Sequence, residues 1–513
     1  MMDLLITTII ICTAVIYPVN TANILVVFYN RAFSHNFVFI PLFQELASKG
    51  HNITYISSYP IQNPNITNIS TKESIPIVQN TINVTHVQSI NAFHESMKIM
   101  WDFYKKGIKY DALFTVDDVN ILLNGPSKYD LLIAEHFNSE LSLVFASKFN
   151  IPYILLSSCS LLPWNQQVFG QSYALATSPV TLTGLSPKMN FYDRIKNTIS
   201  NAEQVIGYNF LCRKRDEEII KKKLKIDVSL DQLVKNASLL MVNTHFTMFG
   251  SRAYVPAIVE VGGIHIQPIK PLPTDIQTFI DEAEHGVVYF CMGSLLRGET
   301  FPVEKRKMFL KVFEKIPQRV LWKWEGELHD KPSNVMIRKW MPQRDILAHP
   351  NVKLFISHGG LLGTTEAVYE GVPILSIPIF GDQMTNVKAV RDKGAAEIMY
   401  YTDLNEDEIF TKINSMLTDP TYKQKAKELS EVFRDRPMSP LETAVYWTEY
   451  VIRHKGAPHL RSAAVGMPWY QYYLIDVLLV IFISIATIFV SLYYLIFKQI
   501  LRLIYKKSKE KQT

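Results

Sequence analysis

A chain of 513 residues is longer than one hydrophobic core supports, so at least two domains are expected. The formal net charge is +6, but residues 1–22 carry −1 and residues 498–513 carry +5, which leaves only +2 for residues 23–497. This near-neutral main part excludes a basic nucleic-acid-binding surface. The four cysteines are Cys12, Cys159, Cys212 and Cys291. Cys12 is expected to leave with a signal peptide, and the three remaining thiols cannot form a disulfide framework. No Cys/His spacing resembles a structural metal site.

The first 22 residues combine an apolar block with small residues at its end. Residues 4–16 carry no charge, and Pro18 and Thr21-Ala22 follow them. This pattern predicts a secretory signal peptide over residues 1–22. The positive charge that usually opens such a peptide is missing, because Asp3 stands there. An uncleaved anchor or a buried strand is the alternative interpretation.

Residues 23–265 are expected to form a first Rossmann-like domain. The loop after its first strand lacks the glycine fingerprint of a dinucleotide site, which indicates another kind of ligand. Residues 165–235 are more polar and are expected to form helical insertions. Strands are predicted at the apolar runs 23–29, 51–57, 131–134, 152–157, 241–242 and 259–264. Three prolines within residues 266–275 predict an interdomain linker over residues 266–280.

Residues 281–460 are expected to form a second domain. Apolar runs alternate with helical patterns, which is typical of a doubly wound parallel sheet in an α/β protein. Strands are predicted at 286–292, 319–324, 335–339, 352–357, 373–377 and 396–399. Polar helices are expected from Asn405 to about Lys455.

The C-terminal end predicts a membrane anchor. Residues 477–497 contain no charge and are long enough to span a bilayer, with aromatic residues before and near the end of the run. The basic tail 498–513 predicts a cytosolic C-terminus, and together with a signal peptide it predicts a type I protein with luminal catalytic domains. Lys509 and Lys511 resemble a dilysine retrieval signal of the endoplasmic reticulum membrane. A buried hairpin is the alternative.

Five sequons are eligible for glycosylation in a lumen. Asn52 lies in a predicted buried strand and is expected to be unused. Asn65, Asn68 and Asn83 lie in a turn-rich stretch and are better candidates, and Asn236 is the fifth.

Residues 340–383 are the most informative stretch of the chain. A buried strand over 352–357 is followed by the turn His358-Gly359-Gly360 and a helix to about Tyr369. Such a strand, glycine turn and helix N-terminus form a cradle for phosphate, because free backbone N–H groups and the positive helix end face one anion. His358 adds a donor, Glu366 accepts from ribose hydroxyls, and Trp340 offers a face for a flat base.

The run WMPQ…HGG…E…GVP…P…DQ resembles the signature of the UDP-glycosyltransferases, the UDP-glucuronosyl- and UDP-glucosyltransferases of animals, and "HGGLLGTTEAVYEGVP" is most similar to the insect branch. The resemblance implies the GT-B fold, two facing Rossmann-like sheets with ligands between their carboxyl ends. It implies that Trp340 stacks on uracil, that Gln343 contacts the nucleoside and that Glu366 binds the ribose. The diphosphate would lie among Ser294, His358, Gly359, Gly360 and Gly363, and the sugar hydroxyls against Asp382 and Gln383. Leu362 departs from the asparagine that mammalian members commonly carry there.

The resemblance also implies a catalytic base. His35 lies sixteen residues before His51 of the stretch Lys49-Gly50-His51, which is the spacing of the family's base. A carboxylate on the other imidazole nitrogen would fix its tautomer, and Glu135, at the end of a predicted strand, occupies that position. Otherwise His35 is an ordinary loop histidine and Glu135 a solvated strand end.

The predicted reaction is inverting transfer of glucose or glucuronate from UDP-glucose or UDP-glucuronate to the hydroxyl of a small lipophilic acceptor, for conjugation or detoxification. No DxD-type carboxylate pair is placed to hold a metal, so no metal or other cofactor is expected. Apolar residues of the first domain suit a greasy acceptor: Phe33, Phe37, Phe39 and Phe137. A homo-oligomer is compatible with the sequence. A non-catalytic binder of UDP-sugars or lipophiles and a transferase for lipids or sterols are the alternatives.

Overall fold

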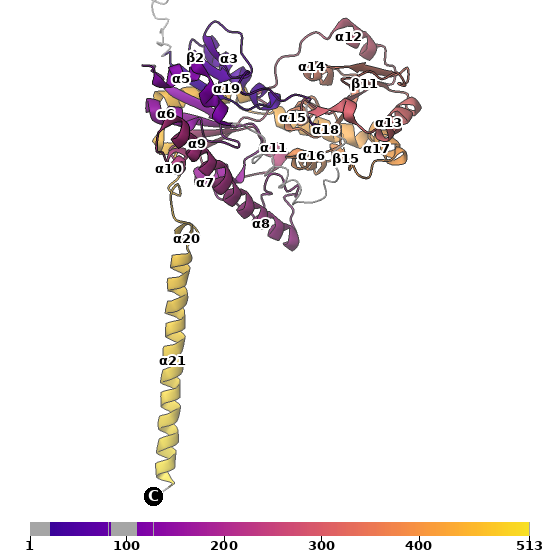
Figure 1. Ribbon diagram of the computed structural model, residues 1–513. Coiled ribbons are helices and arrows are strands. Elements are labelled where there is room, and N and C mark those ends of the chain that lie inside the picture. The colour runs from indigo at the N-terminus through magenta and orange to yellow at the C-terminus, as the bar shows by residue number, and fades with distance from the viewer. Residues whose placement is uncertain (1–20, 81, 84–109, 127, 512–513) are drawn as a thin grey trace, which may run out of the picture. The chain divides into compact units, whose positions relative to one another are not determined.

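The computed structural model describes residues 21–80, 82–83, 110–126 and 128–511, so the predicted signal peptide lies almost entirely outside the described residues. Residues 21–461 form one compact unit and residues 462–511 a second. The first unit contains two parallel sheets with helices on both faces, and the second contains one long helix, α21 (Figure 1). The α/β interpretation is thereby confirmed.

The first sheet has seven strands in the order β3-β2-β1-β5-β6-β7-β8, all parallel. The strands are β1 (Asn23–Phe28), β2 (Asn52–Ser57), β3 (Ile66–Ser70), β5 (Leu131–Glu135), β6 (Tyr153–Ser157), β7 (Leu239–Val242) and β8 (Ile258–Glu260). The central strands are buried along their whole length, which is why each reads as a continuous apolar run. Strand β3 was not predicted, because ITNIS at this edge of the sheet has only two apolar residues and no regular alternation.

Helices cover both faces of this sheet. They are α2 (Phe33–Phe37), α3 (Ile40–Ser48), α5 (Asp117–Asn124), α6 (Leu143–Phe149), α7 (Pro163–Val168), α8 (Phe191–Gly207), α9 (Lys214–Leu224) and α10 (Leu230–Val234), with the 3-10 turn η2 (Tyr110–Thr115) and the π-helical segment η3 (Tyr208–Arg213). Helix α11 (Phe246–Phe249) also follows in this part of the chain but packs against the second sheet. The predicted helical insertions at 165–235 are therefore present, apart from the irregular stretch around residues 170–190.

The second sheet has six parallel strands in the order β12-β11-β9-β13-β14-β15. The strands are β9 (Val287–Cys291), β11 (Arg319–Lys323), β12 (Val335–Arg338), β13 (Val352–Ser357), β14 (Ile374–Ser376) and β15 (Ala396–Ile398). Its helices are α12 (Thr274–Asp281), α13 (Val303–Lys315), α14 (Gln343–Leu347), α15 (Leu361–Glu370), α16 (Gln383–Arg391), α17 (Glu406–Thr418) and α18 (Pro420–Arg434), with the turn η4 (Gly298–Thr300). All six strands lie where the apolar runs predict them.

The two halves exchange elements. Helix α19 (Pro440–Arg453) follows the second sheet in the chain, yet its Ala444, Val445 and Val451 belong to the hydrophobic core of the first sheet. Conversely, Met248 and Phe249 of α11 belong to the core of the second sheet. The predicted second domain, 281–460, includes α19 and leaves out α11, so it does not reflect this exchange. An amphipathic pattern shows which face of a helix is buried but not which sheet covers that face.

A short parallel pairing also joins the halves. Strand β4 (Ile82–Asn83) pairs with β10 (Leu296–Arg297), which follows β9. The peptide N–H of Asn80 donates to the carbonyl of Ser294 at 2.8 Å. The loop after β2 and β3 is therefore bound to the loop after the first strand of the second sheet.

The second unit consists of a connecting stretch from Ser462, the short helix α20 (Trp469–Tyr472) and α21 (Ile475–Glu510). Residues Ile475–Ser508 are long and apolar enough to cross a membrane. The helix continues through the predicted tail, so the basic residues from Lys498 to Lys507 lie on its last turns.

The sequons differ from expectation in two places. Asn52 lies in β2 as predicted, but its side chain is exposed because it begins the strand. Asn68 lies in β3 and not in a loop, and its side-chain amide exchanges two hydrogen bonds of 2.9 Å with the backbone of Ile61. Asn65 and Asn236 are exposed, and the side chain of Asn83 lies outside the described residues.

Candidate active site

The candidate base lies at the carboxyl edge of the first sheet. His35 is on α2, directly after β1, and a buried amide holds this segment: Asn36 donates to the carbonyls of Asn30 and Ala32 at 2.8 and 3.1 Å. The carbonyl oxygen of the Asn36 side chain accepts from Ser57 at 2.8 Å. The position of the imidazole is therefore fixed by packing and not left to a mobile loop.

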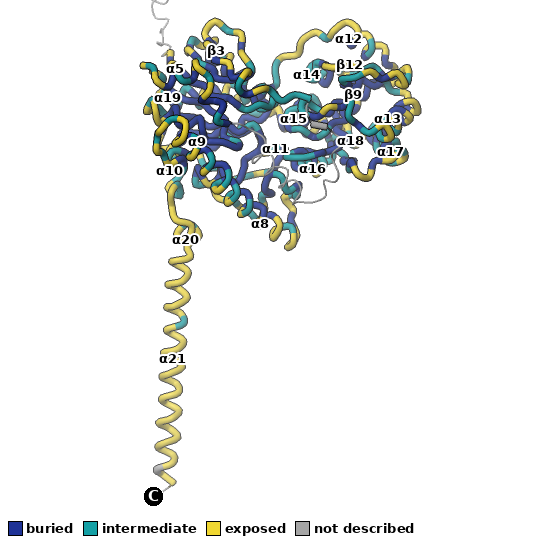
Figure 2. The backbone as a smooth tube through the Cα atoms, in the orientation of Figure 1, coloured by how far each residue is buried: buried dark blue, intermediate teal, exposed yellow. Residues whose placement is uncertain are grey.

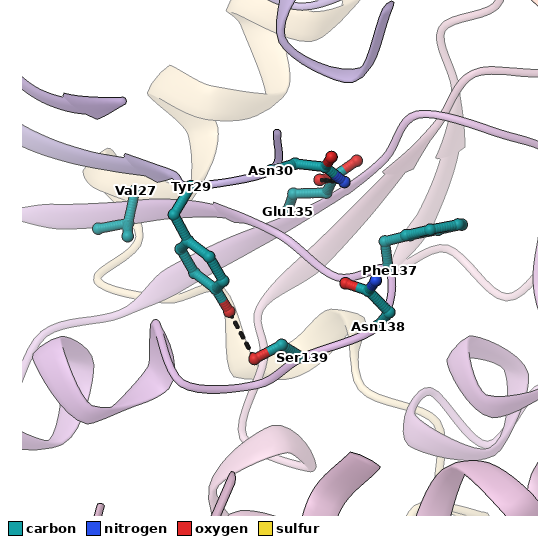
Figure 3. Close-up of a pocket in the computed structure, with 7 residues that line it drawn as sticks. All are labelled: Val27, Tyr29, Asn30, Glu135, Phe137, Asn138 and Ser139. Atoms are coloured by element: carbon teal, nitrogen blue, oxygen red, sulfur yellow. Dashed lines mark hydrogen bonds between the residues drawn. The ribbon is translucent and has the colours of Figure 1, made fainter. Parts of the chain in front are cut away.

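Three neighbouring strands each contribute a polar side chain to His35. Glu135 ends β5, and its Oε1 lies 2.6 Å from Nδ1 of His35. Ser158, after β6, donates to the same Oε1 at 2.6 Å, and Asn30, after β1, donates to Oε2 at 2.9 Å (Figure 3 shows Asn30 beside Glu135). The carboxylate therefore accepts from three groups, which holds it in place as an acceptor for the Nδ1–H.

This arrangement leaves Nε2 of His35 as the basic nitrogen. Among the hydrogen bonds of the described residues, none involves Nε2. Burial disfavours the imidazolium, but the charge and hydrogen bond of Glu135 and the charge of Asp382 outweigh it and raise the pKa of His35 above 6.5. Asn30 and Ser158 were missed by the sequence analysis; their position directly after strand ends is the signal that marks them.

A small pocket opens next to this group. Its lining comes from β1, the end of β5 and the loop after it: Val27, Tyr29, Asn30, Glu135, Phe137, Asn138 and Ser139 (Figure 3). The Phe137 ring packs against His35 with centroids 4.6 Å apart. Phe33 and Phe37 are half-buried nearby, but Phe39 is fully buried against Phe28 in the core and cannot line an acceptor pocket as the sequence predicts.

The phosphate cradle is built around His358. Its ring is enclosed by two glycines: a Cβ on Gly360 would lie 2.5 Å from Nε2, and one on Gly293, whose φ is +81°, would overlap Cε1. Burial, together with the charge of Lys323, lowers the pKa of His358 to about 4, so the ring is neutral. Its buried Nδ1 has no hydrogen-bond partner among the described residues. A neutral ring N–H without a protein acceptor suits an anionic oxygen of a ligand.

Helix α15 starts at Gly360 without a side-chain cap, so its first peptide N–H groups remain available. The side chain of Leu362, on this first turn, packs against the core of the first sheet, and its carbonyl lies 3.3 Å from Nε2 of His265. Leu362 thus makes an apolar contact between the halves. Ser294 is half-buried after β9, at the turn that follows Gly293.

The predicted nucleoside residues form a second group. Gln343, the first residue of α14, donates to Oε2 of Glu366 at 2.6 Å. Gly363 makes room for this bond, because a Cβ there would lie 2.9 Å from Nε2 of Gln343. Burial raises the pKa of Glu366 to about 7. Trp340 is 53% exposed, and its ring meets that of Phe33 from the first half edge-to-face at 6.0 Å. An exposed indole is free to stack on a base.

Asp382 and Gln383 lie at the start of α16. Asn386 donates to Oδ2 of Asp382 at 3.0 Å and to the carbonyl of Gly359 at 3.2 Å. It therefore links a residue predicted to bind the sugar to one predicted to bind the diphosphate. Gln383 differs from expectation: its Oε1 accepts from the backbone of Ile379 and Phe380 at 2.7 and 3.0 Å. Its carbonyl oxygen therefore holds its own loop, and only its NH₂ group remains for a ligand.

The two halves converge at this site. Burial raises the pKa of Asp382, and the charge of His35 opposes that shift, so the two side chains interact across the halves. Burial also raises the pKa of Cys159, and the charges of Asp382 and Glu135 add to the effect. The structure therefore brings His35 and Glu135 together with Asp382. The groups around His358 and Glu366 lie on the same second half.

The sequence model of the family described as UDP-glucoronosyl and UDP-glucosyl transferase matches residues 22–511. The chain belongs to the UDP-glycosyltransferase family. It is therefore an enzyme, and the similarity extends over most of this chain. It is 46% identical over 483 residues to UDP-glycosyltransferase UGT5 of Dactylopius coccus, covering 92% of this chain and 91% of that protein. It is 32% identical over 427 residues to human UDP-glucuronosyltransferase 2B15, covering 82% and 79%.

Solved structures show the same fold at much lower identity. CalG4, the calicheamicin glycosyltransferase, superposes with a TM-score of 0.54 at 14% identity, over 85% of this chain and 99% of that one. VinC in complex with dTDP gives a TM-score of 0.54 at 15% identity, over 84% and 100%. The UDP-glycosyltransferase has the GT-B fold, as the motif implies. The likeness carries no information on substrates.

Proposed function

We propose that this UDP-glycosyltransferase transfers glucose or glucuronate, with inversion, from the UDP-sugar to the hydroxyl of a small lipophilic acceptor. The observation that carries the proposal is the 2.6 Å contact between Nδ1 of His35 and Glu135, which leaves Nε2 as the basic nitrogen, with the charge of Asp382 from the other half acting on the ring. A base from one half and an anion cradle in the other are what a displacement between two bound substrates requires.

In the proposed reaction, the acceptor oxygen attacks the anomeric carbon while the bond from that carbon to the phosphate oxygen breaks. The acceptor proton passes to Nε2 of His35, and Glu135 stabilises the imidazolium that forms. UDP leaves with the bonding electron pair. Its growing charge is balanced by the N–H groups at the start of α15 and by His358. One displacement turns an α-linked donor into a β-glycoside.

The donor sugar and the location belong to the same proposal. The relative UDP-glucosyltransferase 2 of Dactylopius coccus, 39% identical over 466 residues, favours glucose. The half-buried aromatic residues Phe33, Phe37 and Phe137 around His35 favour lipophilic hydroxyl compounds. We place the enzyme in the endoplasmic reticulum membrane with its catalytic unit in the lumen, from the apolar helix α21 and the basic residues that follow its apolar part.

The test is a transfer assay of the purified full chain with UDP-glucose and UDP-glucuronate against a panel of phenols. We expect repeated turnover, a β-linked product, and the same rate with excess chelator, since the sequence has no DxD-type carboxylate pair placed to hold a metal at the diphosphate. Binding of UDP-sugar without turnover would favour the non-catalytic alternative. Loss of activity in chelator that magnesium restores would contradict metal independence.

A further inference from the structure

The buried and exposed faces of helix α8 have the opposite polarity from those of an ordinary surface helix. Its buried residues are polar: Asn197, Ser200, Asn201 and Gln204. Its exposed residues include a long apolar stripe, which η3 continues: Phe191, Ile195, Ile199, Ala202, Ile206 and Phe210. Exposed and buried residues alternate along α8 in Figure 2. A surface helix normally buries its apolar stripe and exposes its polar one.

Two residues of the inward polar face are bound to the neighbouring segment, although Oδ1 of Asn201 and Oε1 of Gln204 have no partner among the described residues. Asn197 accepts from the N–H of Val180 at 2.7 Å and donates to the carbonyls of Leu175 and Ser178. Gln204 donates to the carbonyl of Thr181 at 3.0 Å. These bonds hold the segment 175–181 against the helix and fix which face of α8 points outward. The apolar stripe is therefore exposed as a consequence of specific polar contacts, not of loose packing.

The exposed stripe is large. The five large side chains on it are between 42% and 63% exposed, and Tyr192 beside it is 74% exposed. A contiguous apolar face of this length on a soluble surface marks an interaction site. We propose that the α8 stripe is a membrane-binding surface. It lies in the interfacial region of the same bilayer that α21 crosses.

The charges around the stripe fit a lipid surface. Arg194 and Lys196 are exposed on either side of Ile195, and Lys188 and Lys214 are exposed near the two ends. Lys214 also lies over the ring of Phe210 at 4.4 Å. Apolar and aromatic residues flanked by cations are the composition of helices that lie in the bilayer interface, where the cations meet anionic headgroups. A second copy of the helix would instead bring these like charges together.

The shortness of the connector between the catalytic unit and α21 also supports the bilayer as the partner of the α8 stripe. Only Ser462–Leu474, 13 residues, connect the catalytic unit to the first residue of α21. Fully extended, such a connector spans at most about 45 Å. When α21 crosses a bilayer, the catalytic unit is thus held close to the lipid surface, and even a weak interfacial helix gains from this high local concentration.

The test uses the full chain in vesicles of equal parts phosphatidylcholine and phosphatidylserine, with an environment-sensitive fluorophore on Ile199→Cys. Ile121→Cys on α5 is the matched control, because Ile121 is an isoleucine 68% exposed on another helix. Lipids with a nitroxide near the headgroup should quench about half or more of the emission at position 199 and little at position 121, since interfacial helices sit roughly 5–10 Å deep. The double change R194Q/K196Q should weaken the quenching in the same vesicles.

Two results would overturn the proposal. Emission at position 199 that stays water-like and unquenched would show that the stripe meets no lipid. A blue-shifted but unquenched emission would show that protein covers it, either a second copy or another segment of the chain.

Discussion

At the scale of single residues, the site depends on how Glu135 is held. Its carboxylate accepts from His35 on α2, from Ser158 after β6 and from Asn30 after β1. The sequence identified His35 and Glu135 through their spacing and their place in the family motif. It did not identify Asn30 or Ser158, because a single polar residue after a strand has no pattern of its own until the strands are placed side by side.

Removing the charge of Glu135 should move the pH dependence of transfer. The base must be neutral, so activity falls as the pH falls through the pKa of His35. Burial lowers that pKa and Glu135 raises it, with a net raised value. In E135Q burial prevails, so we expect the acid limb of kcat/KM to move to lower pH and the plateau to fall at least about tenfold, ~1.4 kcal/mol of transition-state stabilisation.

The variant E135D is the control for this measurement, because it keeps the charge on a shorter side chain. Its acid limb should remain near the position of the unmodified enzyme, with a smaller loss in rate. An acid limb that stays in place or rises in E135Q would contradict the role assigned to Glu135.

At the scale of elements, the glycines after β9 and β13 are what let a strand, a turn and a helix enclose His358. The sequence predicted β13, the turn and α15 from one continuous motif. It could not show that Gly293, 65 residues earlier, lies against the same ring. That contact arises because β9 and β13 are neighbours in the sheet although α13, β11 and β12 separate them in the chain.

Substituting Gly293→Ala should weaken UDP binding. The new Cβ would overlap the His358 ring and displace it from the cradle, and the left-handed backbone adds about 1–2 kcal/mol of strain. Gly250→Ala is the control, because it also puts an alanine at positive φ (+83°), but the nearest atom to its Cβ, on Pro187, is 3.8 Å away. We expect both variants to lose stability in thermal unfolding and only Gly293→Ala to lose UDP affinity in calorimetry. Equal UDP affinity in the two variants would contradict the placement of His358.

At the scale of the whole molecule, two sheets and an apolar C-terminal helix could be predicted from the pattern of apolar residues and from composition. The exchange of α11 and α19 between the halves could not. Neither could the pairing of β4 with β10, which joins segments more than 200 residues apart through two residues of strand each. Contacts of this kind leave no periodic trace in a sequence. They nevertheless position the loops that bring His35 from one half and Asp382 from the other to one place.

The central claim is that the first half supplies the base and the second half binds the donor. The most direct test measures transfer and UDP binding on the same preparation of H35A. Because His35 contributes only to proton transfer, we expect transfer to fall about 10²–10⁴-fold while UDP affinity stays within about twofold. Transfer at the rate of the unmodified enzyme would contradict the account.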